Sequence, residues 1–312
     1  MKSYAVLFPG QGSQHKDMLQ AYLDNKIFID TLNESSKILE YDVIKIVEDE
    51  SKLNNTVYTQ PIMLATSIAM WRVWCKKIKL NPSFAAGHSL GEYSALVASG
   101  VLSLSDGLKL VSERAKMMVD AMGNIKGSMA AIIGLNGDQV IDICSSLSSG
   151  NNVIEAVNFN SDSQIVVAGN NDLIEKSSDE FKKAGAKIVK VLPVSVAAHT
   201  SIMKTCSEKL NKLLLNIDFN DQLFPVIHNE DAQSKTSKDD IISTLTKQIH
   251  SAVMWSQSVK NITKSNIEIF IEIGPGNVLT GLNKRISKEL STISISDSSV
   301  IDQAVRLIDN NA

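Results

Sequence analysis

Residues 83–98 read SFAAGHSLGEYSALVA, and this stretch decides the fold. Its centre, residues 87–91, matches the pattern G-x-S-x-G between an apolar run and a segment of small residues. In this pattern a strained turn joins a strand to a helix and raises the serine hydroxyl above the sheet, while the glycines let neighbouring backbone pass close. The stretch therefore predicts a strand, a helix over 92–98, and between them Ser89 as a nucleophile. The alternative is a tight glycine turn whose serine has no chemical role.

Two more apolar runs end in glycine-rich loops. Residues 3–8 precede PGQG at 9–12, and residues 268–273 precede GPG at 274–276. Longer stretches of helical period separate these short runs, which indicates an α/β fold with a largely parallel sheet. Ligand sites of open α/β sheets lie at the carboxyl ends of strands, where all three loops are expected.

Residues 128–192 follow a different order, β-α-β-β-α-β. This is the split βαβ, ferredoxin-like arrangement, and it is complete within one short segment. We therefore expect a ferredoxin-like subdomain at 128–192, inserted into an α/β catalytic domain formed by 1–127 and 193–312. The expected strands are 129–133, 153–158, 164–168 and 187–192, and the expected helices are 138–147 and 172–184.

Composition excludes several classes of protein. The chain has 312 residues, of which 44% are apolar and 21% charged, so it is neither disordered nor a long coiled coil. A net charge of -3 gives no overall attraction to nucleic acid or to an anionic membrane. The longest apolar stretch, 61–71, is too short to span a bilayer, and no signal peptide is visible. Three widely spaced cysteines without a C-x-x-C pair favour a reduced, cytoplasmic setting.

A serine nucleophile needs a base, and the chain offers five histidines: His15, His88, His199, His228 and His250. Spacing alone does not choose among them. His199 lies on the connection that leaves the inserted unit, where a returning loop can overhang the strand-to-helix turn at residues 87–91, which we call the elbow. The loop at 9–14 fails both nucleotide-binding fingerprints, because position 15 is not glycine and no Walker A pattern occurs. Its backbone N–H groups are candidates for an oxyanion hole instead.

Arg114 is the most informative single charge. On a helix over 106–122 it shares a face with apolar residues at 110, 111, 117, 118 and 121. An unpaired buried guanidinium is costly, so an anionic group should meet it, either a side chain or a ligand carboxylate. A structural salt bridge, or a side chain that extends to water, is the alternative.

Five motifs together resemble one family, the malonyl-CoA:acyl carrier protein transacylases of bacterial fatty-acid synthesis. They are LFPGQGSQ at 7–14, QP at 60–61, GHSLGEYSAL at 87–96, NFN at 158–160 and IEIGPGNVL at 271–279. The resemblance spans nearly the whole chain. It implies an α/β-hydrolase-like core with a small ferredoxin-like subdomain, in agreement with the organisation predicted above.

The resemblance also implies a role for each site residue. It makes Ser89 the nucleophile and His199 the general base, and it implies that a backbone carbonyl near Gln248 orients the histidine in place of the usual Asp. The remaining implied residues are Gln11 and the Leu90 N–H in the oxyanion hole, Arg114 against the malonyl carboxylate, and Gln60, Gln248 and Asn158 as further substrate-binding residues. The chain departs from the family at Ala197-Ala198, where Pro-Ser is common, and at Ala252, where Pro is common.

The implied activity moves a malonyl group from malonyl-CoA to the phosphopantetheine thiol of holo acyl carrier protein. We expect no metal and no cofactor, no nucleic-acid or membrane partner, and a monomer. One rival is a serine esterase or thioesterase, which shares the elbow and the base but normally adds an acid between serine and histidine in the chain. The other is a silent binding module that keeps the fold, against which the intact set of Ser89, His199 and Arg114 argues.

Overall fold

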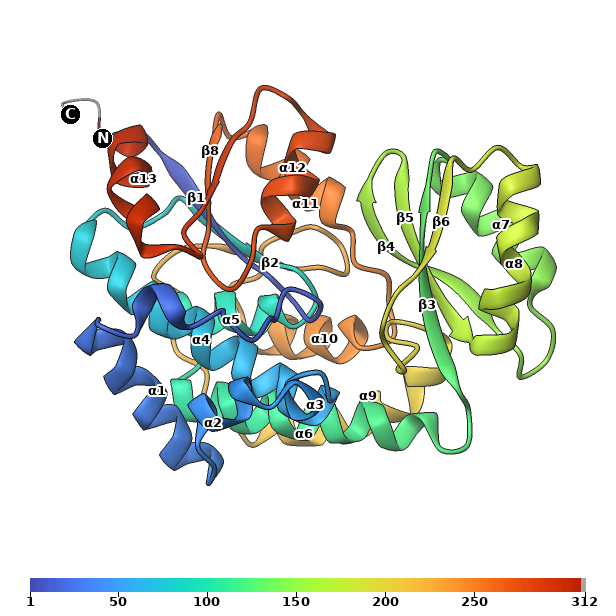
Figure 1. Ribbon diagram of the computed structural model, residues 1–312, viewed down its shortest axis with the longest axis horizontal. Coiled ribbons are helices and arrows are strands. Elements are labelled where there is room, and N and C mark those ends of the chain that lie inside the picture. Colours follow the sequence, from blue (N-terminus) through green and yellow to red (C-terminus); the bar gives the residue numbers. More distant parts are fainter. Residues whose placement is uncertain (310–312) are drawn as a thin grey trace.

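The computed structural model describes residues 1–309 and contains two sheets (Figure 1). The larger sheet has the order β7-β2-β1-β8-β9, and every neighbouring pair in it is parallel. Its strands are β1 (Tyr4–Phe8), β2 (Phe84–Gly87), β7 (Val226–Ile227), β8 (Ile269–Glu272) and β9 (Ser291–Ser294). The expected α/β core with a parallel sheet is confirmed.

Helices cover both faces of the parallel sheet. Strand β1 shows why, because Ala5 and Leu7 face one core while Tyr4, Val6 and Phe8 face another. A strand buried on both faces is a continuous apolar run, as seen at residues 4–8. The helices of this lobe are α1 (Lys26–Leu39), α2 (Val43–Glu48), α3 (Glu50–Leu53), α4 (Thr56–Lys77), α5 (Gly91–Ala98), α6 (Leu104–Met122), α9 (Lys204–Leu215), α10 (Lys238–Gln248), α11 (Trp255–Thr263), α12 (Val278–Ile286) and α13 (Ile301–Ile308), with short 3-10 helices at Gln20–Tyr22, Ser201–Met203 and Ser298–Val300.

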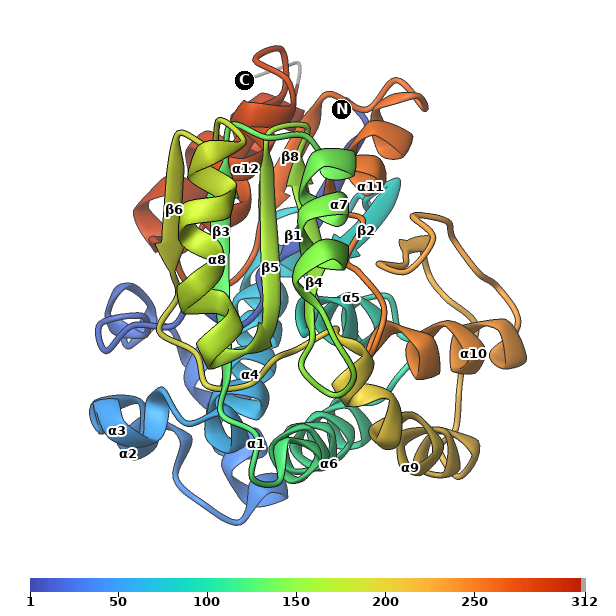
Figure 2. The ribbon, with the colours of Figure 1, turned by 90° about the vertical axis from the view of Figure 1, so that its right-hand side faces the viewer.

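The smaller sheet is antiparallel, with the order β4-β5-β3-β6. Its elements are β3 (Gly127–Ile133), α7 (Gly137–Leu147), β4 (Ile154–Ser161), β5 (Gln164–Asn170), α8 (Asn171–Lys183) and β6 (Ile188–Val191). Figure 2 shows α7 and α8 on its outer face. The predicted β-α-β-β-α-β order is confirmed. We call these elements the small lobe and the rest the large lobe; the domain boundaries at 128 and 192 stay predictions.

The two lobes share a core. Along β3, Ala130 and Ile132 face α7 and α8, whereas Met129 and Ala131 belong to the core of the large lobe. Strand β4 also reaches across, because Phe159 N–H donates to the Val253 carbonyl at 2.9 Å. This bridge accompanies two register shifts in β4, so the strand continues to Ser161 instead of ending at 158 as predicted. Similarly, α6 begins at Leu104, ahead of the expected residue 106, since Ser103 caps it.

Two glycines of the elbow permit an unusually close backbone approach. A Cβ on Gly87 would lie 1.9 Å from the backbone of Gly91, and a Cβ on Gly91 would lie 2.0 Å from the Phe8 carbonyl oxygen. No side chain can yield there, since the obstructing atoms belong to the backbone. The end of β1, the end of β2 and the start of α5 are thus packed directly together.

We therefore expect Gly91→Ala to lower the free energy of unfolding by about 3 kcal/mol, because the added methyl forces the backbone apart. Gly281→Ala is the matched control: it lies in the exposed part of α12, where an added methyl would have nothing within 4 Å, and should gain roughly 0.5–1 kcal/mol. Urea unfolding measures both variants. Equal effects would contradict the steric interpretation.

Candidate active site

Ser89 lies at the sharp turn between β2 and α5, in the left-handed region with φ 51°. Its Oγ is 2.7 Å from Nε2 of His199, although the two residues are 110 positions apart. Nδ1 of His199 lies 2.8 Å from the backbone carbonyl oxygen of Gln248. A carbonyl can only accept, so Nδ1 carries the proton and Nε2 presents a lone pair to the serine hydroxyl. The arrangement is a serine with a base already oriented to take its proton.

The loop that carries His199 is held from both lobes. His199 itself is in the left-handed region, with φ 65°. Two residues later, the backbone N–H of Ser201 donates to the Glu155 carboxylate at 2.9 Å, and Glu155 belongs to β4 of the small lobe. The strained residue is therefore held by the Gln248 carbonyl of the large lobe at its ring and by Glu155 of the small lobe just after it in the chain.

The surroundings of His199 keep the imidazole neutral. Burial, followed by the positive charge of Arg114, lowers the pKa of His199 from 6.5 to about 3. At neutral pH the ring is therefore free to accept a proton from Ser89. Its side chain is 3% exposed, which also limits access of water.

Arg114 is buried in α6, with 1% of its surface exposed. Its guanidinium donates to Gln60 Oε1 at 2.7 Å and to Gln248 Oε1 at 3.1 Å, and it lies 3.5 Å from Ser89 Oγ. All these acceptors are neutral. Within residues 1–309 no carboxylate forms an ion pair with Arg114. The structural salt bridge is thus absent from the described chain, and the alternative of a ligand carboxylate stands.

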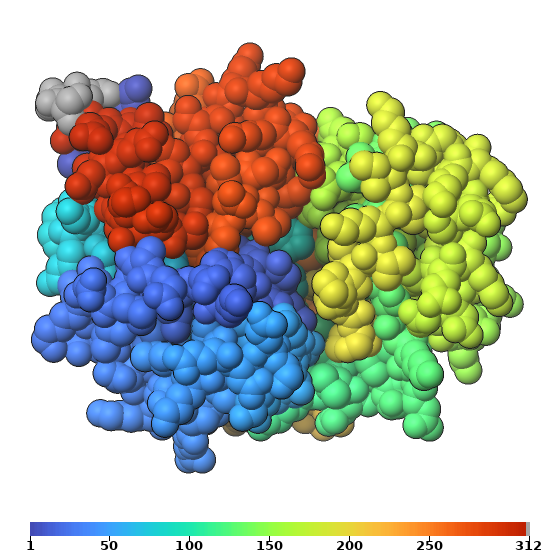
Figure 3. All heavy atoms as spheres, viewed as in Figure 1, coloured from blue at the N-terminus to red at the C-terminus, as the bar shows by residue number. Residues whose placement is uncertain are grey.

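A cavity of about 460 Å³ opens beside Ser89, between the two lobes. Figure 3 shows the surface hollowed where the yellow-green lobe meets the rest of the molecule. The structure brings all eight predicted site residues together here. Seven line the cavity and Gln248 supports it from behind; the seven are Gln11, Gln60, Ser89, Leu90, Arg114, Asn158 and His199.

Two of the predicted positions suit stabilisation of a negative oxygen. Leu90 precedes α5, where the first N–H groups of a helix have no partner inside it and the helix dipole favours an anion. The side chain of Gln11 donates to Thr56 Oγ1 at 3.1 Å, which fixes the loop after β1 against α4. The oxyanion role of both residues stays a prediction.

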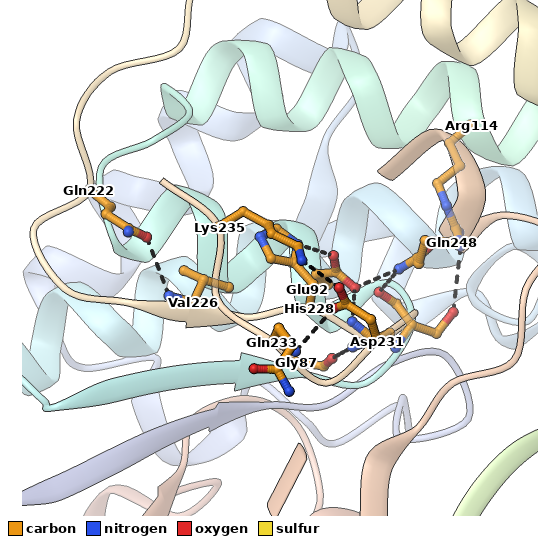
Figure 4. Close-up of polar contacts among 12 residues, drawn as sticks. Gly87, Glu92, Arg114, Gln222, Val226, His228, Asp231, Gln233, Lys235 and Gln248 are labelled. Carbon is orange, nitrogen blue, oxygen red and sulfur yellow. Dashed lines mark hydrogen bonds and ion pairs between the residues drawn. The ribbon is translucent and has the colours of Figure 1, made fainter. Parts of the chain in front are cut away.

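A polar network that the sequence does not predict lies beneath the elbow (Figure 4). Asn229 donates to the Gly87 carbonyl at 2.6 Å and accepts from the Ser89 N–H at 2.6 Å, so it clamps both sides of the turn. Glu92, wholly buried, accepts from the Asn229 N–H and the Gln248 amide and faces His228. The only sequence signal was that the GHSLGE motif carries a charge where the helix should be apolar.

The other histidines have different surroundings. His228 contacts Glu92 and His88 lies 2.8 Å from Asn160 Oδ1, while His15 is exposed. His250 is half-buried and follows Gln248. Among residues 1–309 no cluster of three His, Cys, Asp or Glu side chains could hold a metal ion, and no helix there is long and apolar enough to cross a membrane.

Comparison with known proteins identifies the family. Residues 6–305 match the family described as "Acyl transferase domain". The chain belongs to this acyl transferase family. It is 42% identical over 301 residues to the malonyl CoA-acyl carrier protein transacylase of Haemophilus influenzae, covering 95% of this chain and 96% of that protein. It is 40% identical to the transacylase of Staphylococcus aureus, with 95% and 96% covered.

Solved structures agree with the sequence comparison. A type II PKS acyl-carrier protein in complex with its malonyl-transacylase matches with a TM-score of 0.95 and 39% identity, covering 98% of this chain and 100% of that one. The malonyl CoA-acyl carrier protein transacylase of Coxiella burnetii also matches with a TM-score of 0.95, at 35% identity and 98% coverage of both chains. The resemblance to malonyl-CoA:acyl carrier protein transacylases is therefore confirmed.

The departures from the family pattern lie around the site. Ala198 lines the cavity, whereas Ala197 is wholly buried behind it. Ala252 precedes the residue that pairs with β4 and lines a separate groove with α7. None of these alanines displaces Ser89, His199 or Arg114 from the contacts described above.

The lowered pKa of His199 leads to a pH prediction. His199 of the folded protein has a pKa of about 3. The rate of acylation should therefore stay nearly constant as the pH falls from 8 to about 5.5, whereas a base with the ordinary histidine pKa would give a rate about tenfold lower at pH 5.5. The measurement is kcat/KM for acylation by malonyl-pantetheine, which lacks a titrating phosphate, with circular dichroism to confirm folding. A midpoint close to 6.5 would contradict the assignment.

Proposed function

We propose that this protein transfers the malonyl group of malonyl-CoA to the phosphopantetheine thiol of acyl carrier protein, and so supplies fatty-acid synthesis. The curated relatives carry this activity in their names, and a structural neighbour is a complex with an acyl-carrier protein. Acyl carrier protein is accordingly the partner.

The surroundings of Arg114 are the observation that supports malonyl as the acyl group. Arg114 is buried, has only neutral acceptors and lies 3.5 Å from the serine oxygen. A guanidinium offers a planar fork that suits a carboxylate, and in a dry site this pairing is strong. Malonyl-CoA has a free carboxylate close to its thioester, so the same group can contact Arg114 while its carbonyl meets Ser89.

The first half-reaction forms a malonyl-serine ester. Ser89 Oγ attacks the thioester carbonyl carbon as His199 Nε2 takes the hydroxyl proton. The tetrahedral oxyanion is placed near the Leu90 N–H and Gln11. Collapse breaks the carbon–sulfur bond, and the imidazolium returns its proton to the departing CoA thiolate.

The second half-reaction is the reverse with a different thiol. His199 takes the proton of the phosphopantetheine thiol, whose sulfur attacks the ester carbonyl, and then returns the proton to Ser89. The Gln248 carbonyl holds His199 in the same tautomer throughout. These steps draw on side chains and backbone groups alone, so we expect no cofactor and no metal.

We also propose that the protein acts in the cytoplasm as a monomer. All three cysteines are free thiols, as suits a reducing compartment. Every residue assigned to the reaction comes from one chain.

Intact-protein mass spectrometry after mixing with malonyl-CoA tests the proposed function. The wild-type protein should gain one malonyl adduct and lose it when holo acyl carrier protein is added. Ser89→Ala should remain folded and unlabelled, since the oxygen that forms the ester is gone. An adduct on another residue of that variant would refute the nucleophile, and rapid release of free malonate without carrier would favour the esterase instead.

Arg114 should determine selectivity for malonyl over acetyl. In Arg114→Ala the substrate carboxylate loses a charge-assisted partner, at about 3 kcal/mol, and malonyl transfer should fall over a hundredfold. Transfer from acetyl-CoA, which has no carboxylate, should change little. Arg114→Lys should restore only part of the activity because it lacks the fork. An equal fall for both substrates, in protein shown to be folded, would make Arg114 structural.

A further inference from the structure

Glu92 is a buried acid that the proposed reaction does not use. It lies in the first turn of α5, three residues after Ser89, and is wholly buried. Its Oε2 accepts from the Asn229 N–H at 3.0 Å and from the Gln248 amide at 3.2 Å, and its Oε1 lies 2.7 Å from His228 Nδ1. Two N–H donors converge on Oε2, an arrangement that suits an ionised carboxylate.

Gln248 links this charge to Arg114. Its Oε1 accepts from the guanidinium, while its Nε2 donates to Glu92 (Figure 4). The same Nε2 also donates to the Ser89 carbonyl. A flipped amide would point its NH₂ group at the guanidinium, so the orientation is fixed. The amide dipole therefore has its negative end toward the cation and its positive end toward the anion.

Arg114 and Glu92 are both buried, and the side-chain amide of Gln248 lies between them, so the two charged groups do not touch. A carboxylate in direct contact with Arg114 would neutralise it but would also fill the fork that a ligand needs. A carboxylate one amide away lowers the cost of burying the guanidinium and leaves that fork open.

We propose, resting on the proposed function, that Glu92 is the counter-charge of Arg114 and a positioning residue that sets how tightly the site holds a carboxylate. Glu92 makes no contact with substrate. It acts through Gln248, and its charge moderates the attraction of Arg114 for the malonyl carboxylate, which must enter and leave in each cycle.

Glu92→Gln tests the charge and preserves the shape. Its new amide oxygen can accept from Asn229 and Gln248, and its new NH₂ group can donate to His228 once that ring carries its proton on Nε2. The substitution removes the negative charge and requires His228 to carry its proton on Nε2. Removing one charge an amide away from Arg114 should change the affinity for an anion by about tenfold.

Calorimetric titration with malonate is the measurement. Glu92→Gln should bind malonate about tenfold more tightly than the wild type, because Arg114 is no longer compensated. A residue that only holds Gln248 in place would give the opposite sign or no change, and either result would overturn the proposal. The matched control is Glu272→Gln, another wholly buried glutamate, which accepts from the N–H groups of Leu279 and Thr280 and from the Thr280 hydroxyl. Its malonate affinity should equal that of the wild type.

A double variant keeps the test decisive if Glu92→Gln alone does not fold. If the two charges compensate each other, Glu92→Gln combined with Arg114→Gln should fold as well as Arg114→Gln alone. A double variant that fails to fold, although Arg114→Gln alone folds, would overturn the proposal.

Failure of the proposed role of Glu92 can be distinguished from failure of the proposed function. Wild-type protein that is not acylated by malonyl-CoA would refute the transferase assignment, even if Glu92→Gln tightens malonate binding. Wild-type protein that is acylated, together with no gain in malonate affinity in Glu92→Gln, would refute only the role of Glu92.

Discussion

The site depends on one close backbone approach, where the turn after β2 passes over the end of β1. Gly87 and Gly91 have no room for a Cβ, and the turn between them holds Ser89 in the left-handed region. Asn229 then bridges the two sides of this turn. The serine is therefore presented by packing and hydrogen bonds that exist before any substrate arrives, which is the condition for preorganised catalysis.

The positive charge of Arg114 lies next to this rigid turn. Within residues 1–309 no carboxylate forms an ion pair with it. Gln60 and Gln248 satisfy part of the Arg114 guanidinium without neutralising it, and burial together with that charge keeps His199 unprotonated. In the proposed reaction, a positive site with a neutral base would discriminate between acyl groups by charge and still allow proton transfer. The cation proposed to select the acyl group also adds to burial in lowering the pKa of His199.

The fold and the position of Ser89 can be predicted from the sequence because both have local signals. The elbow is formed by consecutive residues of one motif, and the small lobe alternates strands and helices in a recognised order. His199 has no such signal: it is one of five candidate bases, and only the resemblance selects it. Asn229 and Glu92 could not be assigned, since their contacts join residues about 140 positions apart through the two-residue strand β7. Likewise, the run at 129–132 is apolar throughout because its two faces serve different cores, which periodicity alone does not reveal.

The hydrogen bond between Phe159 of β4 and Val253 matters when domains are exchanged between related enzymes. Asn158 lines the cavity, its neighbour Phe159 is bonded to Val253, and Val253 follows shortly after the carbonyl that orients His199. A chimera that grafts a foreign small lobe onto this chain also replaces Glu155, one support of the loop that carries His199. Such grafts should be designed with the segment 248–254 and Glu155 taken from the same parent, so that the boundary lies outside the supports of the histidine.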